Sequence, residues 1–226
     1  ILPHDLIEIG AETGAGKTDL VTTIANLNAA AGKRVFVIAL EAELGEIERR
    51  TKYGLIARWA FERKYDNAHR LSYVDWYLGR CERLIGGLDA EADEYMRTKL
   101  RGLHTFYRGA HFDGTNIEKL LTTWQTQADL FVIDHLHYVD IDDDKNENAA
   151  YKKLIKLIRN VALACGKPVI LVVHLRKGDT GRREPLVPSI DRVHGSSEIS
   201  KIATSAIMIS RAPFVGSDWW KAPTFF

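Results

Sequence analysis

A glycine-rich turn follows the apolar run at residues 6–9 and leads into a helical pattern that begins at Lys17. This order is typical of loops that wrap backbone N–H groups around phosphates. Gly14 and Gly16 let the backbone approach an anion, Lys17 supplies a positive charge, and Thr18 offers a hydroxyl for Mg²⁺. The helix directs its positive end at the same anion. The sequence therefore predicts an ATP-type nucleotide site. The predicted loop comprises Ala11, Glu12, Thr13, Gly14, Ala15, Gly16, Lys17 and Thr18.

The loop departs from the usual motif at its first position. Ala11 stands where the motif has glycine, and Gly10 lies one place early. The alternative interpretation is a glycine-rich turn between strand and helix that binds no ligand. The apolar strand before the loop and the helix after it favour nucleotide binding.

Composition indicates the class of protein but does not identify a binding partner. The chain has 226 residues, of which 46% are hydrophobic and 27% charged, which is ordinary for one globular domain. No apolar stretch approaches the ~20 residues that span a bilayer, so we expect no membrane association and a cytoplasmic location, nucleoid-associated or phage-encoded. Cys81 and Cys165 are expected to be reduced thiols. The net charge of +1 argues neither for nor against nucleic acid. Both chain ends look cut, so we expect residues 1–226 to be one domain of a longer protein.

Strand and helix patterns alternate along the chain, which predicts an α/β fold with a mainly parallel sheet covered by helices on both faces. Near-continuous apolar runs are typical of strands buried on both faces. The strands are expected at residues 6–9, 34–40, 105–108, 129–134, 168–173 and 204–210, with a further strand starting near residue 222. The helices are expected at residues 17–31, 43–60, 116–127 and 149–165, with a broken helical region over 67–103.

Ligands of such sheets bind beyond the carboxyl ends of the strands, so the residues that end each strand are candidates for the site. Asp134 ends an apolar strand and is predicted to bind Mg²⁺ across from Thr18, the alternative being a loop or capping aspartate. Glu41 follows another strand and is the candidate general base. Glu43 is a rival, although it better fits the first turn of the next helix.

His174 follows the strand at residues 168–173 and is a candidate sensor of the γ-phosphate, or else a packed or solvent-facing histidine. The loop after it is rich in glycine, proline and basic residues, so it could hold a sugar-phosphate backbone or be only a solvated charged loop. The candidate DNA-binding residues are Arg176, Lys177, Arg182 and Arg183.

Five stretches together resemble the RecA-like core of DnaB-type hexameric replicative helicases. They are the phosphate loop, residues 40–41, 132–138, 172–175 and 195–211, and they cover nearly the whole chain in the order of that family. The Gly-Ser-Ser stretch that leads to a strand ending in arginine separates this family from other RecA relatives. Histidine after the strand at residues 168–173 makes the chain most similar to the branch with phage primase-helicases and mitochondrial Twinkle.

The resemblance implies a role for each matching residue. It makes Lys17 the phosphate-binding lysine, Glu41 the catalytic base, Asp134 the metal-binding acid and His174 the phosphate sensor. Arg211 would pack on the nucleotide base. The resemblance further implies a homo-hexamer that hydrolyses Mg²⁺-ATP at subunit interfaces, with an arginine finger from the neighbour and single-stranded DNA in the central channel.

Other functions share parts of this pattern. A RecA-, RadA- or KaiC-like ATPase that forms filaments or regulatory rings would use the same loop and the same two acids. A binding or assembly module would need no general base, and Glu41 and Asp134 at strand ends disfavour it. A small-molecule kinase is disfavoured because no arginine-rich, lid-like segment is evident.

Overall fold

The computed structural model describes residues 1–141, 147–175, 201–211 and 224–225. A seven-stranded sheet is its centre, with strand order β3-β2-β4-β5-β1-β6-β7. All neighbours pair in parallel except β6 and β7, which are antiparallel. The strands are β1 (Leu6–Ala11), β2 (Val35–Ala39), β3 (Leu103–Tyr107), β4 (Leu130–Asp134), β5 (Val169–His174), β6 (Ser205–Arg211) and β7 (Thr224–Phe225). The predicted α/β fold with a mainly parallel sheet is confirmed.

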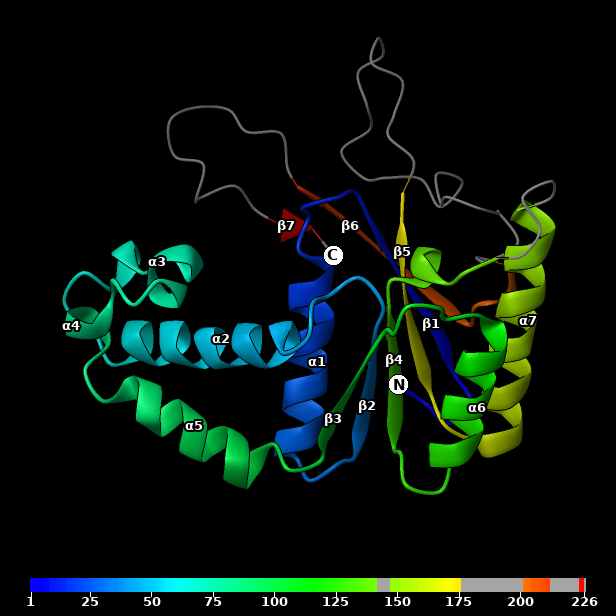
Figure 1. Ribbon diagram of the computed structural model, residues 1–226, viewed down its shortest axis with the longest axis horizontal. Coiled ribbons are helices and arrows are strands. Elements are labelled where there is room, and N and C mark those ends of the chain that lie inside the picture. The colour runs from blue at the N-terminus through cyan, green and yellow to red at the C-terminus, as the bar shows by residue number, and fades with distance from the viewer. Residues whose placement is uncertain (142–146, 176–200, 212–223, 226) are drawn as a thin grey trace, which may run out of the picture.

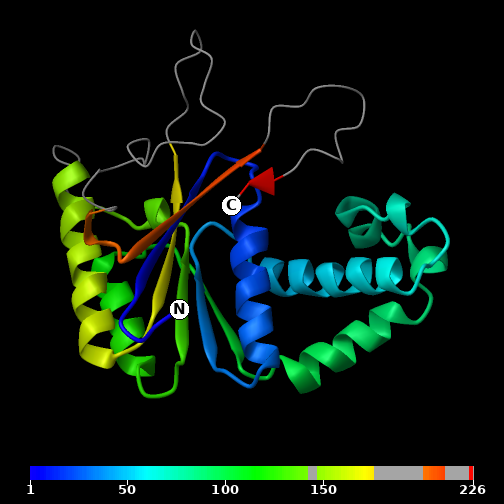
Figure 2. The same ribbon diagram turned by 180° about the vertical axis from the view of Figure 1, so that it is seen from behind.

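Helices cover both faces of the sheet. Helices α6 and α7 pack on one face, while α1 lies on the other with α2 to α5 extending away from it as an arm (Figures 1 and 2). The α-helices are α1 (Lys17–Ala30), α2 (Glu46–Glu62), α3 (Tyr73–Tyr77), α4 (Glu82–Ile85), α5 (Leu88–Lys99), α6 (Gly114–Trp124) and α7 (Glu147–Cys165). Within the described residues there are also two short 3₁₀ helices, η1 (Ala68–Arg70) and η2 (Leu136–Tyr138). Among the described helices, none is long and apolar enough to cross a membrane.

Most predicted boundaries differ from the structure by one to three residues, and two of these differences have a clear cause. The second helix begins at Glu46 rather than at residue 43, because the Glu46 carboxylate accepts a hydrogen bond from the Glu43 backbone N–H at 3.1 Å and Gly45 takes a positive φ. Strand β3 begins at Leu103, two residues before the predicted start, because Leu103 pairs with Val35 of β2. Tertiary pairing therefore extends this strand beyond its local pattern.

Each face of the sheet has its own apolar core. Side chains of α6 and α7 pack on one face, and those of α1 pack on the other. A third cluster joins α2 to α4 and α5 within the arm. Cys81 is buried in that cluster, and both cysteines are free thiols. These cores hold the strands in a fixed register, so their carboxyl ends form a rigid edge.

Phe36 should be one of the most important side chains for stability. It is 2% exposed on β2 and its ring lies within 6 Å of those of His104, Phe106, Trp124 and Phe131. We expect Phe36→Ala to lower the free energy of unfolding by about 3–5 kcal/mol through lost burial and a residual cavity. The matched control Phe61→Ala, at a side chain that is 78% exposed, should change it by less than about 0.5 kcal/mol. Chemical denaturation would measure both, and equal losses would contradict this description of the core.

Candidate functional site

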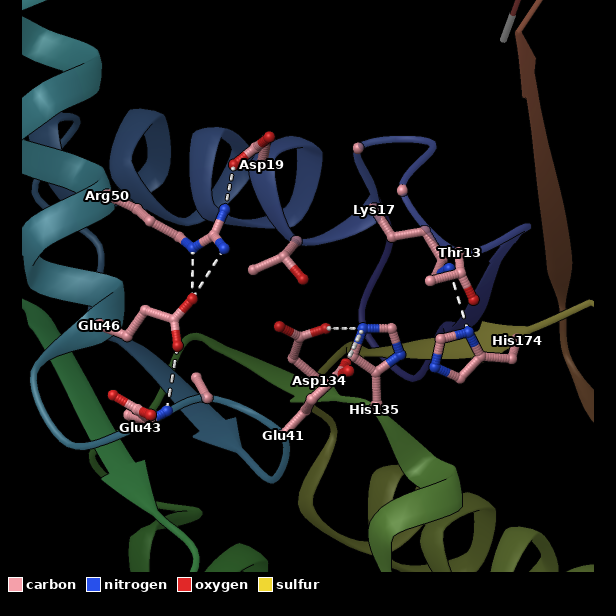
Figure 3. A pocket seen from close by; sticks show the side chains of 14 residues that line it. Thr13, Lys17, Asp19, Glu41, Glu43, Glu46, Arg50, Asp134, His135 and His174 are labelled. Atoms are coloured by element: carbon pink, nitrogen blue, oxygen red, sulfur yellow. Dashed lines mark hydrogen bonds and ion pairs between the residues drawn. The ribbon is translucent and has the colours of Figure 1, made fainter. Parts of the chain in front are cut away.

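Four neighbouring strands bring the predicted site residues to one edge. The phosphate loop follows β1, Glu41 follows β2, Asp134 ends β4 and His174 ends β5, and these strands lie in the order β2-β4-β5-β1. The register places Ala39 opposite Asp134 and Ala11 opposite His174. A cavity of about 440 Å³ lies at this edge, and Lys17, Thr18, Glu41, Asp134 and His174 all line it (Figure 3).

The loop geometry depends on two glycines. Gly14 and Gly16 have φ values of 76° and 92°, in the left-handed region that favours glycine, and Gly16 directly precedes helix α1. The Ala15 N–H donates to the Glu12 carbonyl at 3.2 Å, which closes the turn. Thr13, Gly14 and Gly16 line the cavity, so the helix N-terminus faces the space where phosphates are expected.

The departure at Ala11 has a structural explanation. Ala11 is the last residue of β1 and is fully buried. Its carbonyl accepts hydrogen bonds from the Leu175 N–H at 3.1 Å and from the Lys17 ammonium at 2.9 Å. Any small residue can occupy this extended position, so glycine is not required there.

The Lys17 ammonium is held inside the loop. It donates to the carbonyls of Ala11 and Glu12, at 2.9 and 3.0 Å, and lies 3.3 Å from His174 Nδ1. Burial lowers the pKa of Lys17, while the carboxylates of Glu41 and Asp134 oppose that shift. The lysine is thus pre-positioned at the wall of the cavity, where a phosphate oxygen could replace a carbonyl as its partner.

Asp134 and Thr18 form a pair that fits a divalent cation. Asp134 is 2% exposed, and both its side chain and that of Thr18 line the cavity. Burial raises the pKa of Asp134 to about 7. Its Oδ1 is buried and accepts no hydrogen bond from the described residues. An orphaned carboxylate oxygen beside a hydroxyl is the kind of donor set that Mg²⁺ prefers, and the bound cation would favour the ionised carboxylate.

Glu41, rather than Glu43, is built into the centre of the site. The Tyr138 hydroxyl donates to Glu41 Oε1 at 3.1 Å, and His135 Nε2 lies 2.8 Å from Glu41 Oε2. Glu43 also lines the cavity, but its backbone N–H contributes to the cap of α2, and the contacts with Tyr138 and His135 are made by Glu41. Of the two candidate bases, Glu41 is therefore the one whose carboxylate has fixed neighbours in the site.

His174 is packed among other histidines. Its ring stacks on that of His135, with centroids 4.3 Å apart and an interplanar angle of 10°. Its backbone N–H donates to His137 Nδ1 at 3.4 Å. Burial lowers the pKa of His135 to about 3, with nearby His174 and Lys17 adding to the effect. The 2.8 Å approach of His135 to Glu41 is thus a contact between a neutral imidazole and a carboxylate.

The sequence interpretation missed residues that tertiary packing brings to the site. Arg50 of α2 lines the cavity, held by Glu46 at 2.7 Å and Asp19 of α1 at 3.2 Å (Figure 3). No spacing rule connects Arg50 to the phosphate loop, because its position depends on how α2 crosses α1. His135 directly follows Asp134 in the sequence, and this adjacency was the only available signal for it.

Several predicted residues are not placed. Arg176, Lys177, Arg182 and Arg183 lie outside the described residues, as does the Gly-Ser-Ser stretch. The backbone of Arg211 ends β6 and pairs with Thr224 of β7. The roles of these residues stay predictions.

Comparison of the coordinates with solved structures places this architecture among known folds. The solved structure of an ATPase domain matches with a TM-score of 0.70 at 15% identity, over 93% of this chain and 71% of that chain. A DnaB-like replicative helicase, solved to study its interactions with primase, matches with a TM-score of 0.73 at 14% identity, over 97% of this chain and 49% of that chain. The chain has a RecA-like fold.

Sequence comparison adds no closer assignment, since no family model and no curated protein matches the chain. The RecA-like core nevertheless agrees with the expected resemblance to DnaB-type helicases at the level of fold. At 14–15% identity, the match shows how the strands are arranged. The chemistry has to be inferred from the residues of the site.

Proposed function

We propose that this RecA-like core is the ATPase of a motor on single-stranded DNA, similar to a replicative helicase. The observation that supports this most is the convergence of the phosphate loop, Glu41, Asp134 and His174 on one cavity. A site that only binds nucleotide needs the loop and a metal acid, whereas a restrained carboxylate above them suits hydrolysis.

Each side chain has a task in hydrolysis. Lys17 and the loop N–H groups bind the β- and γ-phosphates and offset the negative charge that develops there. Thr18 and Asp134 would hold Mg²⁺, which supplies further charge stabilisation when bound. Glu41 accepts a proton from the water that attacks the γ-phosphorus, as the bond to the β–γ bridging oxygen breaks. His174, beside Lys17, contacts the γ-phosphate and senses its loss.

Action on DNA and assembly are the further parts of the proposal. We infer that Arg176, Lys177, Arg182 and Arg183 contact the phosphates of the single strand, because they are the basic residues of the segment that comes after the sensor histidine in the sequence. Arg211 packs on the nucleotide base. A homo-hexameric ring would place each ATP between two subunits, with an arginine from the neighbour completing the site. The replicative helicase among the similar structures supports this choice.

Single-stranded DNA should raise the rate of ATP hydrolysis severalfold in the full-length protein, because the basic loop lies next to the sensor in the sequence. Turnover would be measured with and without a single-stranded oligonucleotide, with duplex DNA of the same length as the control.

A strand-displacement assay would test unwinding, and electron microscopy of the ATP-bound protein would show its assembly. Unchanged turnover on adding single strands would refute the motor. Filaments instead of closed rings would favour the RecA-like alternative.

A further inference from the structure

His135 lies between the two acids of the site. It follows Asp134 at the end of β4 and is only 3% exposed. Its Nε2 lies 2.8 Å from Glu41 Oε2 and 3.4 Å from Asp134 Oδ1. Because both neighbours of this nitrogen are carboxylate oxygens, the ring proton belongs on Nε2 rather than on Nδ1. Its Nδ1 is buried and has no hydrogen-bond partner among the described residues, which agrees with that tautomer.

Glu41 needs such a partner because its position is otherwise loosely defined. It comes just after β2 ends, and its side chain is 41% exposed. An exposed glutamate samples several rotamers, and fixing one opposes its conformational entropy. The Tyr138 hydroxyl holds Oε1 and His135 is within hydrogen-bonding distance of Oε2. Both oxygens are thus restrained, while each keeps a lone pair for a water molecule.

The orientation of His135 is itself fixed by packing. Its ring stacks nearly parallel on that of His174, whose Nδ1 lies 3.3 Å from the Lys17 ammonium. A continuous series of contacts therefore links Lys17 through His174 and His135 to Glu41. The carboxylate of Glu41 is positioned by the same side chains that surround the phosphate site.

A metal ion held by Glu41, His135 and His174 is a less suitable explanation of this cluster. Their ligand atoms do lie within 4.8 Å of one another. Imidazole nitrogens bind metals along lone pairs in the ring plane, and the two rings are stacked with an interplanar angle of 10°. One ion cannot lie in both ring planes, so the stack favours a positioning role.

We propose that His135 is a positioning residue that orients the carboxylate of Glu41 toward the attacking water. This inference rests on the proposed function, since it assumes that Glu41 is the general base. It predicts that the catalytic step, rather than ATP binding, depends on the Nε2–H of residue 135.

Two amide substitutions test the role of that N–H. In His135→Gln the side-chain amide reaches the place of Nε2, whereas in His135→Asn it reaches only the place of Nδ1. We expect His135→Asn to lower kcat by about 10–100-fold, with the affinity for a fluorescent ATP analogue within about threefold of wild type. His135→Gln should stay within a few-fold of wild type in both measurements. Equal kcat values for wild type and His135→Asn would overturn the proposal.

A double-mutant cycle separates positioning from a general structural effect. If His135 acts through Glu41, His135→Asn should cause little further loss of turnover in a Glu41→Gln background. A loss of the same factor in both backgrounds would overturn the inference, because it would show that His135 acts independently of the base. If the wild-type chain failed to hydrolyse ATP at all, the proposed function would fail instead, and the two failures are thus distinguishable.

Discussion

Lys17→Ala should lower the rate of ATP hydrolysis by at least about 10²–10³-fold and weaken ATP binding as well. The ammonium is already positioned at the cavity wall by the Ala11 and Glu12 carbonyls, so its loss removes a preorganised charge from the phosphates. The effect should appear in both binding and catalysis, because the lysine contacts phosphate before and during the reaction. Steady-state turnover and titration with a fluorescent ATP analogue would measure the two parts.

The matched control for this change is Lys119→Ala. Lys119 is an exposed lysine on α6, and it does not line the cavity. Its loss should leave turnover and affinity unchanged, and thermal unfolding would show that both variants fold. If Lys17→Ala kept wild-type turnover, nucleotide would have to bind elsewhere on the chain.

Glu41→Gln should lower hydrolysis by about 10²–10⁴-fold while ATP still binds. Glutamine keeps the shape of the side chain and an oxygen for the Tyr138 hydroxyl, but it cannot accept the proton of the attacking water. The loss should therefore fall on kcat, with little change in ATP affinity. Single-turnover hydrolysis of bound ATP would isolate the chemical step.

Glu43→Gln is the internal control, because Glu43 lines the same cavity and was the rival candidate in the sequence. Its exposed side chain has neither the Tyr138 nor the His135 contact of Glu41, so we expect turnover within about threefold of wild type, as for a surface change. If Glu43→Gln lowered turnover more than Glu41→Gln, Glu43 rather than Glu41 would be the general base.

The sequence supported a detailed prediction of the fold because the decisive signals are local. Apolar runs marked the buried strands, and Gly14 and Gly16 marked the loop, where a positive φ favours glycine. The parallel sheet rule then placed Asp134 and His174 at the same edge as Lys17, and the structure brings them together in one cavity.

The remaining parts of the site depend on long-range packing. Arg50 reaches the cavity only because α2 crosses α1, and its ion pairs join residues of both helices. His135 acquires its contacts from Glu41 of the neighbouring strand end and from His174 of another. Neither arrangement has a signature within a single sequence window, so sequence periodicity could not have predicted these contacts.

The pairing of β1 also bears on how the protein matures. Leu6 of this strand pairs in register with Val169 of β5, and Ile7 with Ser205 of β6. Within this domain the phosphate loop is therefore synthesised well before β5 and β6, the two strands that pair with its anchoring strand. Such distant pairings form slowly. A nascent chain should acquire nucleotide affinity late and in one step, so that ATP stabilises the completed domain rather than any partly synthesised precursor.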